Sequence, residues 1–339
     1  MKQTSLKSNF LFNLIYQILA VITPIFTTPY ISRVLSADGI GKYSYALSIV
    51  TYFGIFGCLG TATYGQLEIA RNRDNKKLLH KTVSEIFFGR LVTLMISLLI
   101  YFAVILKASG QYKLLYSVLS LYILGQMNDV SFILQGLEWF KMLAMRNIII
   151  KVLNIVLIFA LVREHNDLYI YAIIIHGITL IGNFSLWPQV IKYIKPKSFK
   201  NMNFIQHWKK SMIYFIPTVA TMVYTVLDKS MIGWITGSEF QNGYYEQAYK
   251  IEQILLVFVT TVGTVTFPRM AYFFENDNKE ERKRIMGITM KFIMLIACPI
   301  CFGTMAISEN LIPVFLGKGY EECIPVSYTH LRAHETKAN

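Results

Sequence analysis

Apolar residues occur along this chain in blocks of roughly 20, separated by short polar segments. A helix rises 1.5 Å per residue, so about 20 residues cross the ~30 Å hydrocarbon core of a bilayer. Because backbone exposed to lipid must satisfy its hydrogen bonds within its own segment, each block is expected to be helical. The pattern predicts nine spans, the fifth beginning nearer Leu143, at residues 11–31, 43–64, 86–106, 114–135, 147–162, 168–190, 212–236, 246–268 and 286–307.

The composition supports a membrane protein and excludes a string of soluble domains. Of 339 residues, 54% are apolar or aromatic and 16% are charged, and the mean hydropathy is +0.44. Soluble domains carry about 25% charged residues. We therefore expect an all-α, polytopic membrane protein.

Basic residues alternate between the predicted loops in a way that indicates topology. The net charge is +13, from 33 Lys+Arg against 20 Asp+Glu. In a soluble protein this excess would suggest nucleic acid, but here one alternating set of loops holds 20 Lys+Arg and the other holds 6. The positive-inside rule then places the N-terminus in the cytoplasm, and we expect no nucleic-acid partner.

A short internal repeat suggests two halves. The stretch 41–49 resembles 243–251, with matching Gly, Tyr, Ala and Ile, and the spans before both copies contain proline. Interrupted helices at matching positions of two halves are typical of transporters. We expect a six-helix N-terminal lobe at 1–200, an incomplete C-terminal lobe of about three helices at 201–326, and a non-native tail at 327–339.

Four motifs resemble one known family. They are Thr28–Tyr43 after the first span, Gln135–Phe140 after the fourth, Leu227–Gly233 in the seventh, and Phe315–Tyr320 near the end. With them the chain resembles polysaccharide flippases of the multidrug/oligosaccharidyl-lipid/polysaccharide (MOP) exporter superfamily. About nine spans are present, whereas such proteins usually have twelve or more in two lobes around a central cavity.

The resemblance implies an activity and a location. Such proteins move undecaprenyl-pyrophosphate-linked oligosaccharides from the inner to the outer leaflet of the cytoplasmic (plasma) membrane. The implied partners are the lipid-linked oligosaccharide, the lipid bilayer, and the polysaccharide polymerase and chain-length machinery.

Ionisable groups inside the spans are the candidates for function, because each costs ~2.5–3.5 kcal/mol at the bilayer centre unless it faces a cavity or a partner. A lipid-linked pyrophosphate is an anion, and cavity cations would offset its desolvation. We take four side chains as candidate substrate-binding cations: Lys229, Arg90, Arg33 and Lys250. Two carboxylates are candidates for ion coupling: Asp228 and Asp129.

Most of these candidates also have a structural interpretation. Arg90 and Arg33 lie near span ends, where long side chains can snorkel to the headgroups. The alternative for Asp129, Asp228 and Lys229 is a structural ion pair between helices.

Two further polar features are expected to be structural. Glu246 and Lys250 are four residues apart, which favours a local ion pair. His176, in the middle of the sixth span, is expected to form a hydrogen bond between helices, with proton transfer as the alternative.

Two other functions remain open. A multidrug or cation antiporter of the same superfamily often has a carboxylate in its first span, where this chain has only Asn13 and Gln17 as large polar groups. A membrane polysaccharide polymerase or ligase would need acid/base groups in an outer loop, but the 237–245 loop has only Glu239. Without a nucleotide-binding glycine loop or metal-ligand motif in the sequence, we expect a transporter that is not an enzyme and has no cofactor or metal site.

Overall fold

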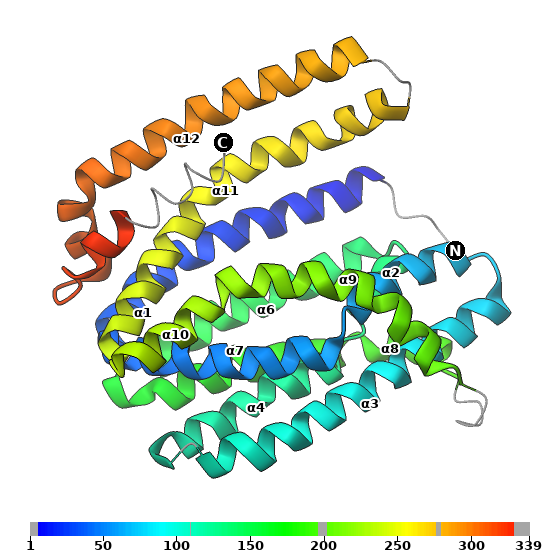
Figure 1. Cartoon of the computed structure of the whole chain (residues 1–339), viewed down its shortest axis with the longest axis horizontal. Coiled ribbons are helices and arrows are strands. Elements are labelled where there is room, and N and C mark those ends of the chain that lie inside the picture. Colours follow the sequence, from blue (N-terminus) through cyan, green and yellow to red (C-terminus); the bar gives the residue numbers. More distant parts are fainter. Residues whose placement is uncertain (1–5, 109, 196–201, 276–278, 329–339) are drawn as a thin grey trace. The chain divides into compact units, whose positions relative to one another are not determined.

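The computed structural model describes residues 6–108, 110–195, 202–275 and 279–328, and in these ranges it is helical, without a strand (Figure 1). The all-α fold class is confirmed. Short turns η1 (Gly110–Tyr112), η2 (His165–Asp167) and η3 (Ile191–Tyr193) connect some helices. The α-helices are α1 (Leu6–Cys58), α2 (Thr61–Asn72), α3 (Lys76–Ala108), α4 (Lys113–Met127), α5 (Ser131–Gly136), α6 (Phe140–Leu161), α7 (Leu168–Phe184), α8 (Trp187–Val190), α9 (Phe204–Thr225), α10 (Leu227–Thr236), α11 (Glu239–Glu275) and α12 (Lys279–Leu316).

The predicted spans fall on these helices. Six stretches of the described chain are long and apolar enough to cross a membrane, and the bent pair α9–α10 makes a seventh. One of the six, Ile18–Asn72, includes most of the first predicted span and all of the second. The predicted span 246–268 lies within α11. The fifth span begins earlier than its apolar block, as expected, because α6 starts at Phe140.

The helices group by their contacts into two units. Unit 1 comprises Met1–Ala20 and Lys42–Glu239, and unit 2 comprises Val21–Gly41 and Phe240–Asn339. These two units are defined by contacts between residues, whereas the two predicted lobes are defined by the internal repeat of the sequence. The lobe boundary at residue 200 and the non-native tail therefore stay predictions, and 329–339 of that tail lie outside the described residues.

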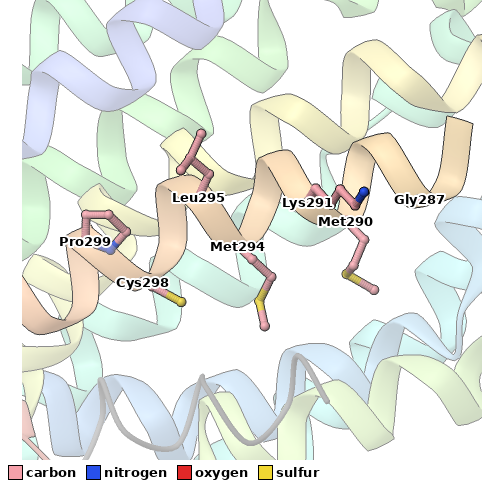
Figure 2. A pocket seen from close by; sticks show the side chains of 7 residues that line it. All are labelled: Gly287, Met290, Lys291, Met294, Leu295, Cys298 and Pro299. Carbon is pink, nitrogen blue, oxygen red and sulfur yellow. The ribbon is translucent and has the colours of Figure 1, made fainter.

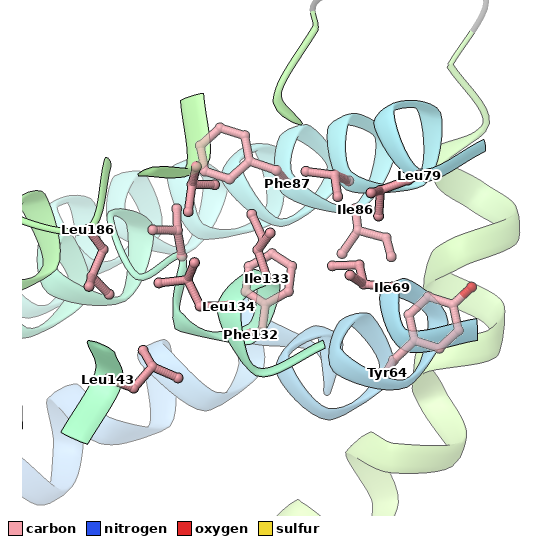
Figure 3. Close-up of a cluster of buried hydrophobic side chains, with 13 residues drawn as sticks. Tyr64, Ile69, Leu79, Ile86, Phe87, Phe132, Ile133, Leu134, Leu143 and Leu186 are labelled. Carbon is pink, nitrogen blue, oxygen red and sulfur yellow. The ribbon is translucent and has the colours of Figure 1, made fainter. Parts of the chain in front are cut away.

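Unit 1 has a dense apolar cluster where short helices meet α3 (Figure 3). Phe132, Ile133 and Leu134 of α5 are at most 1% exposed, and they pack with side chains of α2, α3, α6 and α8. A glycine makes the contact with α2 possible: a methyl group at Gly136 would lie 2.7 Å from the Gln66 carbonyl oxygen. The predicted loop 65–85 is therefore mostly helical, forming the end of α2 and the start of α3.

Two left-handed residues break the chain at matching places before the two repeat copies. Ser36 has φ 57° inside α1, and Gly237, with φ 60°, ends α10. Each lies a few residues before its copy of the repeated Gly-x-Tyr stretch. In unit 2, Gly243 of the second copy touches the main chain at Ala37, leaving no space for a Cβ. The repeated glycine is thus explained in the second copy by close approach of two backbones.

Replacing Gly243 with alanine is expected to destabilise the protein, because the new methyl group collides with the Ala37 carbonyl oxygen. Overpacking of this kind typically costs ~1–3 kcal/mol. The measurement is the thermal unfolding of detergent-purified protein. The control is Gly287→Ala, since nothing lies within 4 Å of a methyl group there. Equal melting temperatures for the two variants would contradict this account.

Candidate functional site

The six candidate residues divide between the two units. Unit 1 contains Arg90, Asp129, Asp228 and Lys229, and unit 2 contains the other two candidates, Arg33 and Lys250. Within unit 1 the structure brings Arg90 and Asp129 together, with 4.0 Å between Nη2 and Oδ2.

The fourth predicted span is interrupted, and polar side chains of other helices converge on the break. α4 ends at Met127 and α5 begins at Ser131, so carbonyl groups at the end of α4 lose their helical partners. Side chains of other helices replace those partners. Gly125 O accepts from Asn183 Nδ2 (2.8 Å), Gln126 O from Arg90 Nη2 (3.1 Å), and Asn128 O from Trp187 Nε1 (3.2 Å).

Arg90 lies inside this break. Its residue is 2% exposed, and Nη2 also contacts Gln126 Oε1 at 3.2 Å. The guanidinium lies 5.4 Å from the centre of the Phe132 ring. The snorkelling interpretation is therefore wrong for Arg90, because its charge points into the unit, toward the negative end of the α4 dipole and Asp129.

Asp129 lies in the turn two residues before the next helix, α5. Its Oδ1 accepts a hydrogen bond from the Ser131 backbone N–H at 2.9 Å, which satisfies one of the free donors at the start of α5. One carboxylate thus serves the start of α5 while its other oxygen faces Arg90. This is the structural ion pair between helices that was the alternative for Asp129.

A second charged group, missed by the sequence analysis, supports the same break. Arg146 of α6 donates from Nη2 to Ser131 Oγ (2.7 Å) and from Nη1 to Asn183 Oδ1. Asn183 is 4% exposed. The available signal was Asn183, a large amide inside the largely apolar sixth span, since a buried amide must find partners on neighbouring helices.

Asp228 and Lys229 lie beside a second interruption. α9 and α10 meet at Val226 with a bend of 41°, nine residues after Pro217, the residue that first suggested an interrupted helix. α10 packs on α1 through a hydrogen bond between Ser230 and Tyr52. Ser230 is fully buried, whereas Asp228 and Lys229 are half-buried.

Arg33 in unit 2 binds a helix end. Its Nη2 donates to Val314 O near the end of α12 at 2.8 Å, where a positive charge is favourable. The following Phe315–Tyr320 motif turns back through Gly317 (φ 104°) and Gly319 (φ 88°), and Tyr320 Oη donates to Ser32 O at 2.9 Å. The two glycines of this motif are therefore required by left-handed backbone.

Other polar residues lie as expected. Lys250 Nζ is 3.8 Å from Glu246 Oε1, which confirms the local ion pair. His176 Nε2 lies 3.0 Å from Tyr43 Oη, and both residues are buried, which confirms the hydrogen bond between helices. Among the described residues, no three His, Cys, Asp or Glu side chains are close enough to hold a metal ion.

The four cysteines are free thiols. Cys298 lies with Met294 and Leu295 in a pocket of about 660 Å³ along α12 (Figure 2). The residues that line it are Gly287, Met290, Lys291, Met294, Leu295, Cys298 and Pro299. Cys323 follows α12, where burial raises the pKa of its thiol to about 12, and its Sγ donates to Tyr244 O at 3.4 Å.

Comparison with known proteins gives consistent results. A family model described as "Polysaccharide biosynthesis protein" matches residues 6–274. A Shigella dysenteriae protein named "Putative O-antigen transporter" is 23% identical over 302 residues, covering 88% of this chain and 74% of that protein. A Haloferax volcanii protein named "Probable low-salt glycan biosynthesis flippase Agl15" is 22% identical over 127 residues, covering 38% of this chain and 26% of that protein.

A solved structure shows a similar fold. It is the inward-facing conformation of a multidrug resistance MATE family transporter of the MOP superfamily. It is 14% identical, covers 92% of this chain and 79% of its own, and has a TM-score of 0.61. The expected MOP-type helical fold is confirmed by this likeness.

Replacing Asn183 with alanine is expected to lower stability, because it leaves Gly125 O and Arg146 without a partner amide. A buried polar group left unpaired costs ~1–3 kcal/mol. Thermal unfolding in detergent measures the effect, with Ser185→Ala as the control, since Ser185 is exposed near the same helix end. An Asn183→Ala protein with the melting temperature of the wild type would show that the break does not need these hydrogen bonds.

Proposed function

This chain belongs to the polysaccharide biosynthesis protein family, and on that premise we propose that it flips undecaprenyl-pyrophosphate-linked oligosaccharides from the inner to the outer leaflet of the cytoplasmic membrane. The observation that carries the proposal is the family match over residues 6–274, on a multi-pass helical fold. Relatives named as an O-antigen transporter and a glycan biosynthesis flippase support glycan-linked cargo. The likeness to a multidrug transporter concerns the fold and does not select the cargo.

The physical requirement on such a protein is to shield an anionic headgroup and a polar glycan from hydrocarbon. Cations along the path would offset the desolvation of the pyrophosphate. Among the four candidates we propose Lys229 as the principal substrate cation, because it is half-buried beside the α9–α10 bend. Irregular backbone at membrane depth is tolerated where it lines a cavity or is buried in protein.

For the remaining candidates, the proposed roles rest on their surroundings. Arg90 and Arg33 each bind main-chain carbonyl oxygen within their own unit, so we propose that they contribute to a cationic path mainly by holding helix ends. Lys250, paired with Glu246, is the weakest of the four.

Ion coupling is proposed for the carboxylates Asp228 and Asp129. Asp228 is the stronger candidate, because it is half-buried beside the α9–α10 bend.

Topology and partners complete the proposal. The excess of 20 against 6 basic residues in alternating loops supports a cytoplasmic N-terminus. A flippase of this kind releases its cargo where a polysaccharide polymerase and chain-length machinery would consume it. We propose that the chain acts as a transporter and leaves glycan bond formation to those partners.

Complementation tests the proposed function. The host gene is deleted, this chain is expressed, and surface polysaccharide is stained while lipid-linked repeat units are located by leaflet. We expect polymer to return. If polymer stays absent although lipid-linked units reach the outer leaflet without the protein, flipping is not its activity.

Replacing Lys229 with glutamine is expected to reduce polymer export at least tenfold at unchanged protein level, because a pyrophosphate then crosses without its main counter-charge. Surface staining normalised to protein amount measures the effect. Lys209→Gln is the matched control, since Lys209 is exposed on α9. Export at the wild-type level by Lys229→Gln would remove Lys229 from the substrate path.

A further inference from the structure

The first half of α9 rests on α2 and α3 at two glycines, outside the candidate site described above. A methyl group at Gly60 would lie 2.6 Å from Phe215 N and 2.7 Å from Ser211 O, so α9 touches the main chain at the start of α2. A methyl group at Gly89 of α3 would lie 3.3 Å from Phe204 Cδ1. Both contacts lie within unit 1.

A chain of three polar side chains joins the same helices. His207 Nε2 of α9 lies 3.1 Å from Glu85 Oε2 of α3, and His207 Nδ1 lies 2.8 Å from Tyr64 Oη of α2. Glu85 Oε1 also accepts from the backbone N–H of Asn203, just before α9, at 3.1 Å. With the ring hydrogen on Nε2, His207 donates to Glu85 and accepts from Tyr64, so every group in the chain has a partner.

These groups are enclosed but not isolated from charge. The side chains of Glu85 and His207 are 6% and 13% exposed. On α3, Lys81 Nζ lies 4.0 Å from Glu85 Oε1. On α2, Glu68 pairs with Arg71 at 3.8 Å beside Tyr64. On α9 itself, the Tyr214 ring lies 6.2 Å from that of Tyr64.

α9 has few buried side chains. Only Ser211, Phe215 and Met222 of its 22 residues are buried, whereas five of the six residues of α5 are buried. Segments with few buried apolar contacts open at low free-energy cost. Hydrogen bonds therefore contribute to holding the first half of α9 against α2 and α3, beside residues 65–85, for which the sequence predicts the cytoplasmic side.

We propose that Glu85, His207 and Tyr64 form a latch that closes α9 onto α2 and α3 and must open for the substrate to enter from the cytoplasmic side. The inference rests on the proposed function. α9 is the first helix of the predicted second half, and α2 and α3 belong to the first half. Moving α9 away from α2 and α3 widens the entry for a glycan headgroup. The hydrogen bonds among Glu85, His207 and Tyr64 form again once the headgroup has entered.

A disulfide across the latch tests whether it must open. The pair Gly89→Cys and Phe204→Cys suits one, because the Cβ at position 89 would lie 3.7 Å from that of residue 204. The control pair Gly57→Cys and Ser97→Cys joins α1 to α3 within the predicted first half, with a Cβ separation of 3.1 Å. Both pairs are made in a background without the four native cysteines.

Glycan transport is measured for each pair, oxidised and then reduced, with disulfide formation quantified by gel shift. We expect the transport rate of the 89–204 pair to fall at least tenfold on oxidation and to recover on reduction. The transport rate of the 57–97 pair is expected to stay unchanged. Transport that continues with the 89–204 disulfide formed would overturn the proposal. An equal loss of transport in both oxidised pairs would also overturn it, because cross-linking α3 to any neighbour would then be enough to stop transport.

A second measurement does not depend on transport. Ser211 of α9 is fully buried where α9 meets the start of α2, so Ser211→Cys in the same background reacts with a maleimide only when α9 leaves α2. We expect Glu85→Gln or His207→Asn to raise the labelling rate at least fivefold, and Glu138→Gln, which removes an exposed pair with Arg73, to leave it unchanged. An unchanged rate in the latch variants would contradict the latch. No transport by the reduced pairs, combined with raised labelling, would contradict the proposed function alone.

Discussion

Main-chain hydrogen bonding at the interrupted helices is the constraint on which the rest of unit 1 depends. In hydrocarbon a free carbonyl has no water to bind, so a break in a span survives only if other side chains supply donors. Between α4 and α5 those donors are Arg90, Asn183 and Trp187, from three different helices. The break thus fixes how α3, α7 and α8 pack around α4, and it accounts for the buried charge.

The same constraint explains two of the candidate charges as groups that hold helix ends. Arg90 and Arg33 each bind a carbonyl oxygen near a helix end, where their charge opposes the helix dipole. Lys229 lies half-buried next to a bend that is packed through Ser230.

The sequence predicted the helices well because a bilayer sets the length of an apolar block, and it predicted the His176 bond because a lone polar group in a span needs a partner. It did not predict the break after Met127. That break depends on pairs such as Arg90 with Gln126 and Asn183 with Gly125, which are far apart along the chain and close only in the fold. The chain Glu85–His207–Tyr64 was missed for the same reason, since its members lie in segments interpreted as loops or span ends.

The central claim, that this chain carries a lipid-linked glycan across a bilayer, is tested most directly in purified proteoliposomes. Vesicles hold undecaprenyl-pyrophosphate oligosaccharide in both leaflets, and a glycosidase that cannot cross the membrane is added outside. The account predicts that vesicles with the protein lose their entire pool to the enzyme. Cleavage that stops at the outer-leaflet share, with protein that still unfolds cooperatively on heating, would contradict it.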